Sequence, residues 1–392
     1  YCGYTVNYIS NFTDVDDKII KAANEAGIST KELSDKFIAA FMEDTGQLGI
    51  KPATQNPRVI NYMDEIIAFV STLVDKGFAY VSEGDVYFRV AKSNNYAKLA
   101  NKTLEDLEIG ASGRTDAETE RKENPLDFAL WKAAKEGEVS WDSPWGPGRP
   151  GWHIECSVMA TEILGGTIDI HGGGADLEFP HHTNEIAQSE AKTGKTFANY
   201  WMHNGFVNVD NEKMSKSLGN FVTVHDMLQT VDGQVLRFFL ATQQYRKPIN
   251  FTEKAIHDAE VNLKYLKNTH SLPLTEQVNQ AELQTYLDAF QEAMDDDFNT
   301  ANGVTVLFDM AKWINSGNYD QTVKDAFEKM LQVFGIVFEE EVLDEDIEKL
   351  IEERQAARAN KDFATADRIR DELAAQGIKL LDTKEGVRWT RD

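Results

Sequence analysis

The chain has 392 residues, of which 42% are hydrophobic and 27% charged, with 26 glycines and 9 prolines, and this composition excludes collagen-like, low-complexity and wholly disordered proteins. Its apolar runs fall far short of the ~20 residues of a membrane helix, and its two cysteines are too few for a disulfide scaffold, so we expect a soluble cytoplasmic protein. The 40 basic and 65 acidic side chains give a net charge of −25, which repels polyanions unless basic residues gather locally.

The predicted elements alternate between strands and helices in the first part of the chain. Alternating apolar residues indicate strands, and apolar residues three or four apart indicate helices. In order, the predicted elements are a strand at 4–8, helices at 17–48 and 60–77, a strand at 86–90, an irregular segment at 91–150, a helix at 151–164, a strand at 168–170, a helix at 180–191 and a strand at 201–209. This alternation is typical of an α/β layer with a parallel sheet.

The second part of the chain is predicted to be mainly helical. Residues 225–338 show helical apolar spacing throughout, which indicates a bundle. An acidic linker at 339–346 precedes one or two charged helices at 347–375 and two strands at 378–381 and 387–389. Residues 348–392 contain ten basic and ten acidic side chains, so the first 347 residues carry the whole net charge. The tail is therefore the part of the chain least repulsive to nucleic acid.

A basic loop carries the first chemical motif, Lys213-Met214-Ser215-Lys216-Ser217. Two lysines three residues apart, flanked by small hydroxyl side chains, can clamp a triphosphate and neutralise charge that develops at its α-phosphate. A generic pair of lysines more often marks a solvated surface loop. This five-residue string, however, resembles the signature loop of class I aminoacyl-tRNA synthetases, which favours Lys213 and Lys216 as catalytic residues.

Cys156, His181 and Glu185 are the candidate ligands of a metal ion. His181 and Glu185 stand four residues apart near the start of a predicted helix and share one of its faces. Cys156, on the preceding predicted helix, can complete the set, and thiol, imidazole and carboxylate groups suit zinc. Taken separately, Cys156 could simply be a small buried apolar side chain, and His181 and Glu185 could be a pair on a helix surface. Their combination favours a zinc site.

Glycines and histidines cluster around the same segment. Three glycines at 172–174 follow a predicted strand, where bare backbone lets a ligand approach, although such a run also suits a tight turn. His153, His171, His181 and His182 lie within thirty residues of one another. We do not expect such a density of histidines from core packing, so it favours a functional site.

Longer motifs resemble those of the cysteinyl-tRNA synthetases over essentially all of the chain. They are NFTDVDDK at 11–18, NPLDFALWK at 124–132, GRPGWHIECS at 148–157, HGGGADL through HHTNE at 171–185, the signature loop at 213–217 and DDDFNTA at 295–301. The resemblance implies a class I Rossmann-like α/β catalytic domain at 1–224 with a connective segment inserted at about 60–150, a helical stem-contact domain at 225–340 and a small mixed α/β anticodon-binding domain at 341–392.

The resemblance also implies the reaction and its cofactors. A ligase of this family activates L-cysteine with ATP to cysteinyl-adenylate and then transfers the cysteine to the 3′ end of its tRNA. One Zn²⁺ per chain on Cys156, His181 and Glu185 would bind the substrate thiolate, which it prefers to the hydroxyl of serine, and Mg²⁺ would accompany the ATP. We expect a monomer whose partners are tRNA, ATP and cysteine, with no membrane association.

The remaining roles are transferred residue by residue. The resemblance implies adenylate binding by His171, Gly172, Gly173, Gly174, Asp176 and Lys216, substrate binding by Trp152, His153 and His182, transition-state stabilisation by Lys216, and tRNA contacts by Arg368, Arg370, Arg388 and Trp389. For the tail, a structural interpretation stays open, with Trp389 in the strand core and the arginines paired to acidic residues across helix turns.

The family pattern begins earlier than this sequence does. It starts with a strand that bears a further zinc cysteine and a helix with a His-Ile-Gly-His type motif, and neither occurs here, while Cys2 falls after that helix. We therefore expect an amino-terminally truncated synthetase, and the sequence leaves open whether this chain is active alone. Two alternatives remain: a ligase that joins cysteine to an amino sugar in mycothiol synthesis, which lacks a carboxyl-terminal module, and a non-catalytic tRNA-binding fragment.

Overall fold

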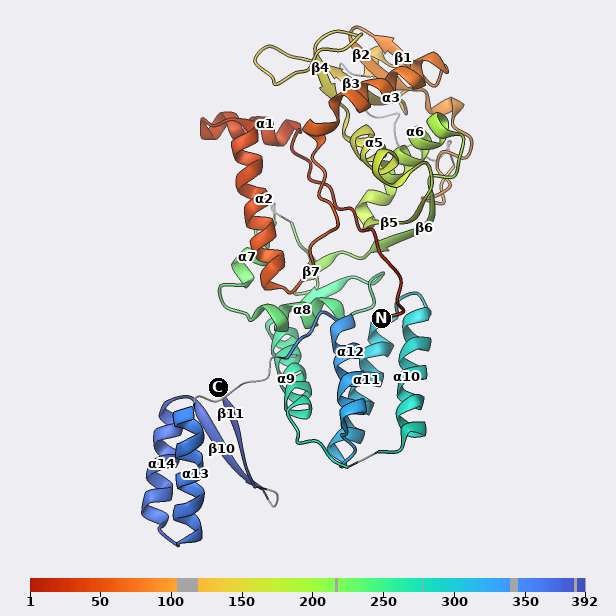
Figure 1. Ribbon diagram of the computed structural model, residues 1–392. Coiled ribbons are helices and arrows are strands. Elements are labelled where there is room, and N and C mark those ends of the chain that lie inside the picture. Colours follow the sequence, from red (N-terminus) through yellow and green to blue (C-terminus); the bar gives the residue numbers. More distant parts are fainter. Residues whose placement is uncertain (104–118, 216–217, 277, 339–344, 384–385, 392) are drawn as a thin grey trace. The chain divides into compact units, whose positions relative to one another are not determined.

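The computed structural model describes residues 1–103, 119–215, 218–276, 278–338, 345–383 and 386–391. The chain forms two compact units, Tyr1–Val337 and Phe338–Asp392. Both units contain helices and strands, which confirms the predicted mixed α/β class (Figure 1). Among the described residues, no helix is long and apolar enough to cross a membrane.

The first residues form an extended segment instead of the strand predicted at 4–8. Isolated bridges at Ile9 and Phe12 connect this segment to a neighbouring stretch of chain. Tyr4, Val6 and Tyr8, whose alternation suggested the strand, are exposed. The prediction is wrong because alternation alone does not make a strand: a ladder of hydrogen bonds to a partner is also required.

The helix predicted at 17–48 is two helices, α1 (Asp17–Ala26) and α2 (Thr30–Gln47). Gly27 adopts a left-handed conformation, with φ at 68°, and ends α1. Ser29 then starts α2 with a capping box. The Ser29 side chain accepts a hydrogen bond from the Glu32 N–H, and the Glu32 side chain accepts one from the Ser29 N–H. The apolar spacing therefore continues across a break that glycine and serine encode.

Two strands of a four-stranded antiparallel sheet lie in the region predicted to be irregular at 91–150. Its strands, in sheet order, are β1 (Ala79–Ser82), β2 (Asp85–Phe88), β3 (Phe128–Ala133) and β4 (Gly148–Pro150). Leu130 and Trp131 are fully buried, which explains why β3 forms in a mostly polar stretch. β4 tolerates Pro150 because it lies at the sheet edge and at the end of the strand.

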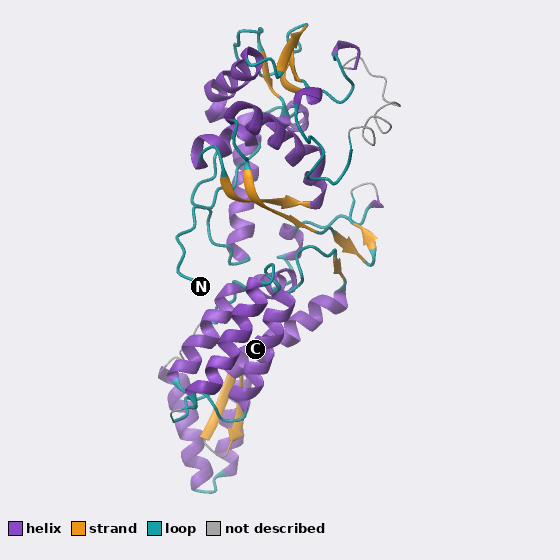
Figure 2. Ribbon diagram, turned by 90° about the vertical axis from the view of Figure 1, so that its right-hand side faces the viewer, coloured by secondary structure: helices purple, strands orange, loops and turns teal. Residues whose placement is uncertain are grey.

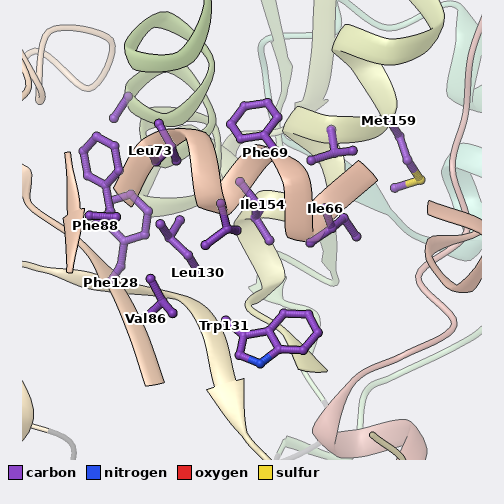
Figure 3. Close-up of a cluster of buried hydrophobic side chains, with 14 of the residues drawn as sticks. Ile66, Phe69, Leu73, Val86, Phe88, Phe128, Leu130, Trp131, Ile154 and Met159 are labelled. Atoms are coloured by element: carbon purple, nitrogen blue, oxygen red, sulfur yellow. The ribbon is translucent and has the colours of Figure 1, made fainter. Parts of the chain in front are cut away.

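The main hydrophobic core lies between this sheet and two helices, α3 (Met63–Asp75) and α5 (Trp152–Leu164) (Figure 3). The short helix η1 (Val59–Tyr62) leads into α3, so the helix predicted at 60–77 is confirmed. The side chains at its centre are Ile66, Phe69, Leu73, Val86, Phe88, Leu130, Trp131 and Ile154. Apolar residues from segments far apart in the sequence are thus buried together.

A second layer contains the parallel pairing predicted from the strand–helix alternation. β5 (Ile168–Gly174) and β6 (Ala198–Asn204) pair in parallel, with α6 (Thr183–Thr193) between them in sequence. Next, β7 (Val207–Val209) pairs with β8 (Glu212–Lys213) in antiparallel and with β9 (Ile249–Phe251) in parallel orientation. The strand predicted at 201–209 is therefore two strands. β9 also interrupts the stretch predicted to be wholly helical.

Six further helices follow β8 in the described part of the first unit, and the four longest, α9 to α12, form a bundle. The six helices are α7 (Val224–Met227), α8 (Gly233–Ala241), α9 (Glu253–His270), α10 (Gln280–Asp295), α11 (Thr300–Asn315) and α12 (Gln321–Val333). Figure 1 and Figure 2 both show α9 to α12 lying side by side. Buried Leu266, Phe290, Leu307 and Phe327 fill the space between them.

The second unit has two helices and a hairpin. They are α13 (Glu345–Ala359), α14 (Phe363–Ala375), β10 (Ile378–Thr383) and β11 (Gly386–Arg391), the two strands being antiparallel. Ile351, Ile369 and Leu373 form its own small core. The predicted charged helices and strand pair are confirmed, while most of the predicted acidic linker, residues 339–344, lies outside the described residues.

Replacing Phe69 by alanine should destabilise the first unit by about 3–5 kcal/mol, because it leaves a cavity in the main core. The measurement is the free energy of unfolding in urea. Phe37→Ala is the matched control, since Phe37 is 63% exposed and its loss should cost far less. Equal losses for the two variants would contradict the assigned core.

Candidate active site

The first turn of α5 is fixed by the close approach of Gly151 to β3. Its N–H donates to the Leu130 carbonyl at 2.9 Å, and a Cβ at this position would lie 2.0 Å from the Ala129 carbonyl oxygen. Glycine is therefore required for this packing. It places Trp152, which is 46% exposed, and the partly buried His153 at the start of the helix.

The three predicted metal ligands come together from two helices and the turn between β5 and α6. Cys156 lies on α5, His181 in the short π-helical turn Glu178–His182, and Glu185 on α6. One possible ligand atom of each lies within 4.8 Å of the others. His181 and Glu185 are 4% and 0% exposed, so they are not a surface pair.

The short π-helical turn Glu178–His182 also explains why α6 begins later than the helix predicted at 180–191. Phe179 has an extended backbone conformation, with φ at −139° and ψ at 128°, so regular helix starts only at Thr183. His181 consequently precedes the helix. Even so, His181 Nε2 reaches to 3.0 Å from Glu185 Oε1, so the predicted proximity of these side chains is retained.

The electrostatics of Glu185 fit a bound cation. Both carboxylate oxygens are buried and have no hydrogen-bond partner of good geometry among the described residues, although His171 Nε2 lies 3.2 Å from Oε2. Burial raises the pKa of Glu185, but His171 and His181 outweigh this effect and bring the pKa below its ordinary value. The group is therefore an ionised carboxylate away from water, which is costly unless positive charge balances it.

The Cys156 thiol supports the same interpretation. Burial raises its pKa well above the ordinary value, and the nearby Glu185 and Glu155 raise it further. A divalent cation among these ligand atoms would stabilise both the thiolate and the carboxylate. Sulfur, nitrogen and oxygen donors together match the ligands that zinc takes in proteins. The residues present therefore fit zinc.

Further histidines extend the site on both sides. His153 Nδ1 lies 2.8 Å from His181 Nδ1, and His182 Nδ1 lies 2.8 Å from His203 Nε2. Burial is the largest cause that lowers the pKa of His153 and of His182, each to about 3. Both rings are consequently neutral at pH 7. His171, His182 and Glu185 form a second group with ligand atoms within 4.8 Å.

His203 is a member of this cluster that the sequence analysis missed. It lies on β6, directly beside β5, where it pairs in register with Gly173. A signal for it was available. His203 lies on the predicted strand 201–209, which follows the strand 168–170 in the chain, and in a parallel sheet the two strands can bring their side chains to the same edge. Four histidines were recognised by their closeness in sequence, whereas the fifth is near them only through strand pairing.

Two of the three glycines at 172–174 are explained by the chain's own side chains. A Cβ on Gly173 would lie 2.9 Å from His182 Cε1, and one on Gly174 would lie 2.4 Å from Asp176 Oδ1. At Gly172 the nearest atom would be 3.5 Å away, an ordinary contact. The glycine run thus lets His182 and Asp176 lie against the end of β5.

The signature loop leaves the β7–β8 hairpin. The Lys213 ammonium lies 4.5 Å from the ring centre of Phe206, while Lys216 and Ser217 lie outside the described residues. Asn220, which the sequence analysis missed, closes the base of the loop. Its Oδ1 accepts from the Ser215 N–H at 2.9 Å and its Nδ2 donates to the Lys213 carbonyl at 3.2 Å.

Arg368, Arg370 and Trp389, three of the candidate tRNA-binding residues of the tail, have contacts within their own unit. Arg368 and Arg370 form ion pairs at 3.2 and 3.1 Å with acidic residues about one helical turn away. Trp389 is partly buried against the small core, and Arg388 lies on β11 next to it in sequence. These contacts correspond to the structural interpretation left open by the sequence, and binding by individual residues stays a prediction.

Comparison with known families gives three matches along the chain. Residues 1–261 match the catalytic domain of class I (C) tRNA synthetases, residues 289–339 match the DALR domain, and residues 340–389 match the cysteinyl-tRNA ligase anticodon-binding domain. Together these three matches cover most of the chain.

Curated relatives match over the full length of the chain. It is 95% identical over 392 residues to a cysteine–tRNA ligase of Streptococcus thermophilus strain CNRZ 1066, covering 100% of the chain and 88% of the relative. It is 81% identical, with the same coverage, to a cysteine–tRNA ligase of Streptococcus agalactiae serotype III.

Solved structures share the fold at low identity. A methionyl-tRNA synthetase of Mycobacterium tuberculosis in complex with methionyl-adenylate gives a TM-score of 0.59 at 15% identity, covering 85% of this chain and 81% of that one. A putative arginyl-tRNA synthetase from Campylobacter jejuni gives 0.53 at 14% identity, covering 87% and 77%. The predicted Rossmann-like class I fold is thereby confirmed.

Proposed function

Because this chain belongs to the cysteine–tRNA ligase family, we propose that it uses ATP to join L-cysteine to the 3′ end of tRNA. The observation that carries the proposal is 95% identity over the full chain to a protein of that name. The match of residues 340–389 to an anticodon-binding domain favours it over the cysteine–amino sugar ligase, and the catalytic-domain match favours it over a non-catalytic fragment.

The reaction has two steps. In the first, the cysteine carboxylate attacks the α-phosphate of ATP, and pyrophosphate leaves as cysteinyl-adenylate forms. In the second, a hydroxyl of the tRNA 3′ adenosine attacks the activated carbonyl and AMP leaves. Negative charge builds up on the phosphate oxygens in the first step, so the lysines of the signature loop, Lys213 and Lys216, act there together with Mg²⁺ carried by the ATP.

Cysteine selection is assigned to the buried cluster. Cys156, His181 and Glu185 would hold one Zn²⁺, which, when bound, supplies a soft acceptor for the substrate thiolate. The neutral His153 and His182 offer uncharged hydrogen-bonding groups beside it. A serine hydroxyl is a poor zinc ligand, so a site built to engage a thiolate discriminates strongly against serine.

The remaining assignments follow the family motifs. The adenylate is assigned to the β5 end and the turn after it, and the substrate amino acid to the start of α5 and to the turn before α6. The residues proposed are His171, Gly172, Gly173, Gly174 and Asp176 for the adenylate, and Trp152, His153 and His182 for cysteine. The protein is proposed to act in the cytoplasm as a monomer.

Substitution of Cys156, the proposed thiolate ligand, should weaken zinc binding. Protein loaded with zinc is expected to hold about one ion per chain, and Cys156→Ser should weaken zinc binding by about tenfold or more. Metal analysis with chelator competition measures both. Cys2→Ser is the matched control, because Cys2 is exposed. Equal zinc affinity in the two variants would refute the site.

The signature-loop lysine should act on the transition state. Lys216→Ala in the full-length gene product is expected to slow cysteine-dependent ATP–pyrophosphate exchange by ~10² or more and to leave cysteine binding nearly unchanged. Lys254→Ala, an exposed lysine on α9, is the control. Undiminished exchange in the Lys216 variant would rule out the role.

The tail should serve tRNA recognition and not activation. Deletion of residues 347–392 from the full-length gene product is expected to raise the KM for tRNA by about tenfold, a loss of about 1.4 kcal/mol, with pyrophosphate exchange almost unchanged. The idea fails if the shortened enzyme charges tRNA with full efficiency, or if changing an anticodon base penalises both enzymes equally.

A further inference from the structure

The turn between α10 and α11 has an unusual backbone. Asp297 and Phe298 are consecutive residues in the left-handed region, with φ at 54° and 51°. Aspartate tolerates this conformation, but for phenylalanine it costs about 1 kcal/mol or more. Phe298 is 48% exposed, so burial of its ring offsets little of this cost. The surroundings of the turn must therefore hold it in place.

Asp297 connects this turn to a segment of the chain more than 50 residues earlier. Its carboxylate accepts from the Tyr245 hydroxyl at 2.8 Å and from Arg246 Nε at 2.6 Å. Close by, Thr300 Oγ1 donates to the Gln243 carbonyl at 2.7 Å. Three hydrogen bonds thus connect the start of α11 and the turn before it to residues 243–246.

The same segment and the residues just after it are hydrogen-bonded to the link between strands β6 and β7 of the proposed active site. The Tyr245 carbonyl accepts from the Gly205 N–H at 2.7 Å, and the Ile249 N–H donates to the Phe206 carbonyl at 2.8 Å. A Cβ at Gly205 would lie 2.4 Å from the Lys247 carbonyl carbon. The two stretches are therefore in close backbone contact, which β9 continues by pairing with β7.

Residues 205–206 stand between the two parts of that site. Gly205 directly follows β6, whose His203 contacts His182 in the histidine cluster. Phe206 carries the Lys213 ammonium over its ring at 4.5 Å. A displacement of this short link would therefore move the signature-loop hairpin relative to the histidines.

We propose that Asp297 is a positioning residue, which fixes segment 243–251 and through it the orientation of Lys213 for adenylate formation. This inference rests on the proposed function for its chemical consequence. Asp297 and Arg246 are 43% and 60% exposed in their side chains, and an ion pair so exposed adds little to global stability. Its effect is expected on local geometry, where a misplacement of about 1 Å is already costly for catalysis.

The test compares Asp297→Gly and Asp297→Asn with Asp296→Asn. Glycine and asparagine both tolerate the left-handed backbone, so these variants remove the carboxylate without new strain. The control removes the same charge one residue away, in the same turn. In cysteine-dependent pyrophosphate exchange by the full-length gene product, both Asp297 variants should lower kcat about three- to tenfold. The KM for cysteine and the melting temperature should match the control.

A double-mutant cycle with Arg246→Gln identifies the contact. If Asp297 acts through Arg246, the double variant should be about as slow as either single variant, whereas independent effects would multiply. Multiplying effects, kcat values equal to the Asp296 control, or a fall in kcat matched by a general loss of stability would each overturn the inference.

Amide hydrogen exchange gives a readout that needs no activity. The Gly205 and Ile249 amides should exchange about three- to tenfold faster in Asp297→Gly than in the Asp296 control, because their acceptor segment is loosened. Unchanged exchange overturns the inference even if the enzyme is active. Conversely, absence of cysteine-dependent pyrophosphate exchange in the unmodified protein, with faster amide exchange in the variant, would refute the proposed function and retain the positioning role.

Discussion

The buried carboxylate of Glu185 is the group around which α5, β5 and α6 are arranged, because a charge removed from water must be balanced by nearby groups. His171 approaches it from β5, His181 from the turn before α6, and the Cys156 thiol from α5. The neighbouring elements bring their polar groups to this one point. Close backbone contacts, such as that of Gly151 with β3, hold the elements near enough to do so.

The second half of the site is held by a different kind of contact. Around the signature loop, the Asn220 side chain hydrogen-bonds to backbone groups at the base of the loop, and the hairpin pairs with β9. Such contacts fix where the chain runs, and Lys213 adds its own contact with the Phe206 ring. The candidate metal site is thus a buried cluster, whereas Lys213 of the signature loop is exposed on a hairpin of short strands.

Much of the site was accessible from sequence because its residues are close together in the chain. His181 and Glu185 are four residues apart, which predicted that they would meet, and the thiol of Cys156 on the preceding helix suggested the third ligand. His203 and Asn220 escaped because their partners are set by strand pairing and by loop closure. In the fold, the helix break at Gly27 and the strands at Phe128–Ala133 and Gly148–Pro150 were missed: apolar spacing continues across a single left-handed residue, and buried strands occurred in a segment rich in polar residues.

The contact between Gly173 and the His182 ring makes these two positions interdependent for any later change of sequence. A methyl group at 173 would lie 2.9 Å from both the His182 ring and the Leu177 side chain, and a smaller residue at 182 would leave a cavity unless a neighbour fills it. Substitutions at the two sites are therefore epistatic: a pair can be acceptable where each member alone is not. A mutational search that changes one residue at a time would therefore miss combinations that preserve this packing.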